Sequence, residues 1–352
     1  MNRKSIKAFL DANVIIEAGK PPGGPIFKRL VDLVESGFVE IITTDLTKDE
    51  VVKKHAENAY NVIKEIGRDH FRDTVKDATG VELPQISKEE VRRLLFEKYF
   101  ISVGYMFERV NAKLLLIDAI KPSEVFSSYT HKNGFFSGEG KKDQFSDAFI
   151  FECIKKETSK DLPIIIVSKD GDFDGPSKSE EYISVVKSID GLFKELGLEI
   201  HEPEVETFLE ENHDAVVENF DSELRGWGLQ VSDIEDAEIE DQNITHMELM
   251  DLVSFGTVGG GKEILVTGSA IIKANVSYTH PDWESAIYDS EDKVSVPFRD
   301  VSGETEVEIK AQISMLIGVG DDGRPNKIKE VGFRNDKFVW VKLDPYDAYS
   351  DY

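Results

Sequence analysis

The chain has 352 residues, of which 40% are apolar, and its 42 Lys and Arg against 68 Asp and Glu give a net charge of −26 at pH 7. This charge excludes a generally basic nucleic-acid coat, and the apolar content excludes a disordered acidic chain. A single cysteine, Cys153, excludes an internal disulfide and a thiolate zinc site, and the N-terminal apolar run is too short for a signal peptide or a membrane span. We therefore expect a soluble protein of the reducing cytoplasm.

The charge is distributed unevenly along the chain. Residues 1–200 carry a net charge of −4, whereas residues 201–352 carry −22. The length allows two domains, and this asymmetry indicates that they differ in character. The nearly neutral first part can approach a polyanion, while the second part repels one unless its acids face elsewhere.

The first part alternates short apolar runs with helical patterns, which is typical of a parallel sheet covered by helices. Thr47 and Glu50 predict a capping box at the start of the helix that follows the second strand. Residues 84–135 have the pattern of a helical insertion. We expect strands at 6–10, 39–42, 112–117, 162–167 and 183–186, and helices at 24–35, from 48 onward, within 84–135 and from about 143.

The pattern changes in the second part. Apolar residues at helical spacing predict one acidic amphipathic helix at 201–229 that bridges two domains. After about residue 230 the apolar period becomes two, which predicts long half-buried strands at 264–278 and 307–319 and a strand pair at 327–333 and 337–343. The predicted fold class is α/β: a parallel-sheet domain at 1–200 with a helical insertion, followed by an antiparallel β domain at 230–352.

Acidic residues lie where the predicted parallel strands end. Asp11 and Asp170 each follow a strongly apolar strand, and Glu50 lies in the first turn of a predicted helix. Ligands of an open parallel sheet bind beyond the carboxyl ends of its strands. Asp143 and Asp147 are four residues apart on one predicted helix and share a face.

Converging carboxylates repel one another, and a divalent cation offsets that repulsion. Oxygen ligands without cysteines or paired histidines favour Mg²⁺ or Mn²⁺. Two such ions about 3.5–4 Å apart activate water for in-line attack on a phosphodiester. The pattern therefore indicates a metal-dependent phosphodiesterase.

Four segments surround these acids: FLDANVII around Asp11, TTDLTKDEVVKKH around Glu50, KKDQFSDAFIFE around Asp147, and IIIVSKDGDF around Asp170 and Asp172. Together they resemble the PIN domain, a family of metal-dependent nucleases, over about residues 5–190. The helical segment inserted before the third acid is similar to that of the uncharacterised bacterial PIN-like branch.

The resemblance implies that Asp11 is the first metal ligand, Glu50 the second acid, Asp147 the third, and Asp170, Asp172 or both the fourth. It implies single-stranded RNA or structured nucleic acid as the substrate, cleaved by metal-activated water to leave a 5′-phosphate and a 3′-hydroxyl.

Neighbouring polar residues are expected to assist. Asn13 and Ser168 would hold the carboxylates through hydrogen bonds. Lys141 and Lys142 are candidates for phosphate contacts. Further candidates of the same kind are Lys53, Lys54 and Lys169.

Two other functions stay open, namely a structure-specific DNA nuclease and a non-catalytic PIN-like module that acts in a larger assembly. For the acidic tail we considered a protein interface, self-association through sheet edges, and competition with nucleic acid. A protein interface is favoured because a net charge of −22 opposes phosphate binding.

Overall fold

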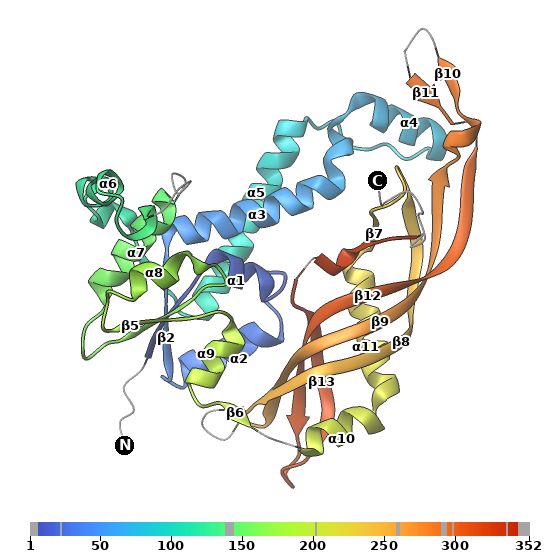
Figure 1. Ribbon diagram of the computed structural model, residues 1–352. Coiled ribbons are helices and arrows are strands. Elements are labelled where there is room, and N and C mark those ends of the chain that lie inside the picture. Colours follow the sequence, from blue (N-terminus) through green and yellow to red (C-terminus); the bar gives the residue numbers. More distant parts are fainter. Residues whose placement is uncertain are drawn as a thin grey trace. The chain divides into compact units, whose positions relative to one another are not determined.

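The computed structural model describes residues 6–21, 23–137, 144–200, 203–257, 261–289, 294–297, 299–335 and 337–343. The chain forms two compact units, residues 1–198 and residues 199–352 (Figure 1). Among the described helices, none combines the length and the apolar character that crossing a lipid bilayer requires.

A five-stranded parallel sheet forms the centre of the first unit. Its strands are β1 (Ile6–Leu10), β2 (Val39–Thr44), β3 (Lys113–Leu115), β4 (Ile164–Val167) and β5 (Ile183–Val186). Their order in the sheet is β3-β2-β1-β4-β5. All four residues of β4 are buried, as expected for a strand with helices on both faces of its sheet. The structure thus confirms the α/β class predicted from the alternating pattern.

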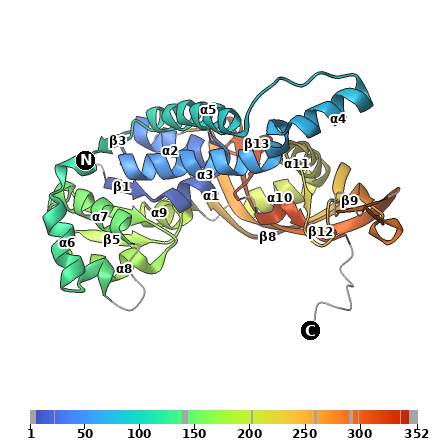
Figure 2. The same ribbon diagram turned by 90° about the horizontal axis from the view of Figure 1, so that it is seen from above.

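Helices connect these strands. The two longest, α3 and α5, lie side by side in both views (Figures 1 and 2). The insertion predicted at 84–135 contains α5, the short strand β3 and α6. The described helices are α1 (Ala12–Glu17), α2 (Pro25–Glu35), α3 (Asp45–Ile63), α4 (Asp69–Thr79), α5 (Lys88–Arg109), α6 (Pro122–Thr130), α7 (Phe145–Glu157), α8 (Asp174–Ser177) and α9 (Ile189–Glu195).

The start of α3 differs from the predicted capping box. The N-cap is Thr44, whose hydroxyl accepts the Thr47 N–H at 3.1 Å and lies 2.8 Å from the Thr47 hydroxyl. Thr47 is therefore buried within the first turn, and Glu50 is not its capping partner. The prediction was wrong because β2 continues directly into α3 without a loop, which places the cap on the last residue of the strand.

The second unit is built on an antiparallel sheet of order β13-β12-β9-β8-β6. The two long strands predicted from the period of two are present as β9 and β12, which pair along their whole length. The strands of this unit are β6 (Glu199–Ile200), β7 (Gln230–Val231), β8 (Glu238–Phe255), β9 (Glu263–Pro281), β10 (Ile287–Asp289), β11 (Val294–Val296), β12 (Asp300–Val319), β13 (Pro325–Phe333) and β14 (Trp340–Val341).

The strand pair predicted at 327–333 and 337–343 was wrong. β13 pairs with β12, and residues 337–339 form a 3₁₀ turn. The short β14 pairs in parallel with β7. The tight turn after β12 returns the chain along that strand, so β13 takes its partner from the preceding strand rather than from the following segment.

We expected one helix that bridges the domains at 201–229. The structure has two, α10 (Pro203–Glu211) and α11 (His213–Trp227), separated at Asn212. They belong to the second unit because their apolar side chains join the core of its sheet. These core side chains are Val205, Leu209, Val216, Phe220 and Leu224.

Candidate active site

Asp11 lies between β1 and α1 and is almost fully buried, with 7% of its surface exposed. It is the N-cap of α1, and its Oδ1 accepts the Ala12 N–H at 2.8 Å. Its Oδ2 accepts a hydrogen bond from the Ser168 hydroxyl at 2.6 Å. Both oxygens of the carboxylate are therefore held in fixed directions.

The sheet order explains how residues 157 positions apart meet. β4 is the neighbour of β1, and the register pairs Leu10 with Val167. The residues that follow these two, Asp11 and Ser168, consequently leave the sheet side by side. The Asp11 N–H also donates to the Val167 carbonyl at 2.9 Å.

Asn13, in α1, links the two strand ends a second time. Its side-chain NH₂ donates to Asp170 Oδ2 at 2.8 Å. Its side-chain oxygen accepts the Lys169 N–H at 3.4 Å. Asn13 and Ser168, the residues predicted to support the acids, thus each contact one of them, Asp170 and Asp11 respectively.

Lys187, which was not among the predicted site residues, also holds the loop that follows β4. Its ammonium donates to the Asp170 carbonyl at 3.1 Å and to both carboxylate oxygens of Asp174 at 2.7 Å. Lys187 follows β5, the neighbour of β4, so its position directly after an apolar strand was the signal that could have identified it.

The remaining acids come from two helices. Glu50 lies in α3 and is exposed, whereas Asp147 lies in the first turn of α7 and is half-buried. Although Glu50 as a whole residue is exposed, partial burial of its carboxylate raises its pKa, and the charges of Asp11 and Asp170 add to this effect. The four segments are therefore close enough for their charges to act on one another.

Asp147 has the largest pKa shift among these acids. Burial, followed by the charges of Asp11, Glu50, Asp172 and Asp170, raises its pKa from 3.8 to about 7. Burial also raises the pKa of Asp11, and the charge of Asp170 adds to this effect. The hydrogen bonds from Ser168 and from the Ala12 N–H act in the opposite direction and favour the ionised form of Asp11.

The donor set fits a hard divalent cation in its chemistry, because it is anionic and consists of oxygen atoms. In the described part of the chain, however, no group of three or more His, Cys, Asp or Glu side chains is arranged to hold a metal ion. The charges of these acids affect one another's pKa values, but the described carboxylates do not converge on one point. A divalent cation bound by these acids would offset their mutual repulsion.

The lysines considered for phosphate contacts differ in their surroundings. Lys169 forms an ion pair with Glu17. Lys53 lies 3.9 Å from Glu57 on the exposed face of α3, and its charge lowers the pKa of Glu50. Residues Lys141, Lys142 and Asp143 lie outside the described part of the chain.

A parallel sheet with acids beyond the carboxyl ends of its strands places the first unit among the open α/β domains, which bind ligands at that edge. Residues 8–173 match the PIN domain family, and the first unit is therefore a PIN domain. No similar curated protein and no similar solved structure is found. The match includes Asp11, Glu50, Asp147, Asp170 and Asp172, and it does not extend into the second unit.

Proposed function

We propose that the protein is a metal-dependent endonuclease that hydrolyses phosphodiester bonds in single-stranded RNA. One observation carries this proposal: burial, together with the charges of acids from three distant segments, raises the pKa of Asp147 to about 7. The PIN domain match supports a nuclease activity. Its choice of RNA over DNA rests on the resemblance of the four acidic segments.

Each acid has a role in this proposal. Asp11, Asp147 and Asp170 are the metal ligands, Asp172 is a further ligand, and Glu50 is the supporting acid. Ser168 and Asn13 hold the carboxylates of Asp11 and Asp170, respectively, through hydrogen bonds. Bound Mg²⁺ or Mn²⁺ would lower the pKa of the attacking water and offset charge on the leaving oxygen.

A cleavage assay with a panel of substrates tests the proposal. Labelled single-stranded RNA, single-stranded DNA and duplexes are incubated with the full chain in Mg²⁺, Mn²⁺ or chelator. We expect internal cleavage of single-stranded RNA that requires the metal and that stops in chelator. Preferential cleavage of branched or duplex DNA would identify the alternative, a structure-specific DNA nuclease. Absence of metal-dependent cleavage on all substrates would support the other alternative, a non-catalytic module.

Replacing Ser168 by alanine should slow cleavage by about tenfold or more, because loss of a residue that orients a metal ligand commonly costs that much. The lost hydrogen bond favours ionised Asp11, so the pKa of Asp11 rises further in the variant. Its activity should therefore need a higher pH than that of the wild type. The pH dependence of cleavage measures both effects.

Ser102→Ala is the matched control, because the Ser102 hydroxyl donates only to a carbonyl of its own helix at 3.0 Å. Equal rates and equal pH profiles for the wild type and Ser168→Ala would show that the Ser168 contact does not support catalysis.

A further inference from the structure

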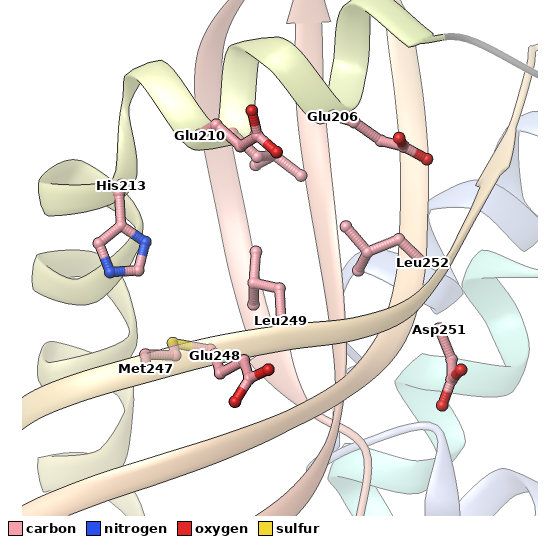
Figure 3. Close-up of a pocket in the computed structure, with 9 residues that line it drawn as sticks. Glu206, Glu210, His213, Met247, Glu248, Leu249, Asp251 and Leu252 are labelled. Carbon is pink, nitrogen blue, oxygen red and sulfur yellow. The ribbon is translucent and has the colours of Figure 1, made fainter.

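The second unit contains a groove between its helices and the strand β8. The cavity has a volume of about 420 Å³. In Figure 3, Leu249 and Leu252 project from β8 towards α10, and Glu248 and Asp251 lie on β8 at the rim of the groove. The lining residues are Glu206, Leu209, Glu210, His213, Met247, Glu248, Leu249, Asp251 and Leu252.

A β-bulge in β8 shapes this rim of the groove. Between Met250 and Val253 the pairing of β8 with β9 shifts register. Asp251 has a φ of +52°, in the left-handed region that non-glycine residues rarely adopt. A Cβ on Gly268 of β9 would lie 2.8 Å from the backbone carbonyl oxygen of Met250, so the bulge requires glycine at that position. Bulges redirect side chains, and here two consecutive residues line the same groove.

The outer edge of β8 is open along the groove. One side of β8 pairs with β9, and the other pairs with β6 at Ser254 and Phe255. None of the described strands pairs with that side between Met247 and Val253. An open strand edge offers backbone donors and acceptors to an extended peptide.

The groove is acidic around an apolar floor. Among its described lining residues there are four carboxylates and no lysine or arginine. Glu206, Glu210 and Glu248 are exposed and form no ion pair within the described part of the chain, and Asp251 accepts a hydrogen bond from Ser269 at 3.4 Å. The partly exposed Leu249 and Leu252 supply apolar surface between these charges.

We propose that this groove binds an extended segment of another protein in which basic side chains alternate with apolar ones. The segment adds a strand to the edge of β8, its apolar side chains contact Leu249 and Leu252, and its basic side chains meet the carboxylates. Charge complementarity selects this occupant. A second copy of the chain would bring its own excess of 22 negative charges from residues 201–352, and a nucleic acid would be repelled in the same way.

Fluorescence anisotropy with the full chain tests the proposal. The probe is a fluorescein-labelled twelve-residue peptide in which lysine alternates with valine. We expect binding that weakens by about tenfold in the double variant Glu210→Lys, Glu248→Lys, because opposite charges in the groove are replaced by like charges. Leu252→Ala should also weaken binding without any change of charge. Circular dichroism verifies that both variants are folded.

The control double variant, Glu218→Lys with Glu304→Lys, makes the same change of charge outside the groove. Both residues are exposed. We expect it to weaken binding by less than about threefold, since salt screens distant charges. Hydrogen exchange locates the peptide, and protection of residues 247–253 is expected on binding. This measurement separates the groove from the acids of the PIN domain, so the result does not depend on nuclease activity.

Four results would each overturn the proposal. They are absence of binding, equal weakening by the groove and control variants, equally tight binding of a peptide in which lysine alternates with glycine, and protection elsewhere than β8. Sedimentation of the chain alone tests the other occupant. A dimer that Leu252→Ala dissociates would show that a second copy fills the groove.

Discussion

Replacing Asp11 by asparagine is expected to lower phosphodiester cleavage by about a thousandfold or more and to leave the fold intact, because removal of one member of a catalytic group commonly has an effect of this size. Asparagine is as good an N-cap as aspartate, so the contact with the Ala12 N–H at 2.8 Å can persist. The amide nitrogen then takes the place of Oδ2, and the Ser168 hydroxyl, which donates to Oδ2 in the wild type, can accept a hydrogen bond from it instead. The shape of the side chain is kept, and the negative charge that a metal ligand supplies at this position is lost.

The measurement is the cleavage rate of labelled single-stranded RNA in Mn²⁺ at saturating protein, with far-ultraviolet circular dichroism as the test of folding. Asp73→Asn is the matched control. Asp73 is exposed on α4, so this substitution makes the same chemical change away from the acids. A variant at Asp11 that cleaves as fast as the control would remove Asp11 from the site and would contradict the nuclease proposal.

Replacing Asp147 by asparagine is expected to stabilise the metal-free protein at high pH. The pKa of Asp147 is about 7 in the folded protein against 3.8 ordinarily, so the folded state binds this proton more tightly than the unfolded state does. Stability from this group is fully present below the unfolded pKa and falls as the pH rises from about 4 to about 7. Above that range the ionised carboxylate is disfavoured by its burial and by the neighbouring negative charges. The free energy of unfolding of the variant should then exceed that of the wild type by about 2 kcal/mol.

Thermal unfolding in chelator at about pH 5 and pH 8 measures this effect. The advantage of Asp147→Asn over the wild type should be large at the higher pH and small at the lower one. Asp73→Asn again provides the control, and its stability relative to the wild type should be the same at both pH values. Equal stability differences between the wild type and the variant at the two pH values would show that the folded protein does not raise the pKa of Asp147.

Adding Mn²⁺ should reverse the order at high pH. A cation bound by the acids stabilises the folded state, and the wild type has one more ligand to bind it. We therefore expect a smaller rise in unfolding temperature for Asp147→Asn than for the wild type. This reading does not require turnover, so it tests the metal site separately from the reaction.

Several elements could be predicted because local patterns are sufficient for them. β4 consists of four consecutive aliphatic residues, and β9 and β12 show a period of two over much of their length, so all three were found from the sequence. In contrast, β8 was missed. Its pairing with β9 shifts register at three points, and each shift breaks the alternation of apolar and polar residues on which the prediction depended.

The helices of the second unit show a different limit. The apolar positions from Val205 to Leu224 correctly predicted a helical segment with one buried face. They did not predict the break at Asn212 or the surface that covers that face. Packing against a sheet is a long-range property, and a bridging helix has the same local pattern as a helix that joins a core.

The sequence by itself determined which acids follow apolar strands, and with them the PIN domain and the nuclease chemistry that we propose. It also indicated Asn13 and Ser168 as partners of those acids. Only the tertiary structure decided that β1 and β4 are neighbours, which brings Ser168 to Asp11 and Asn13 to Asp170. Strand order and bulges depend on contacts between residues far apart in the chain, which local sequence patterns do not contain. For the same reason, the contacts of Lys187 and the acidic groove beside β8 could be identified only from the tertiary structure.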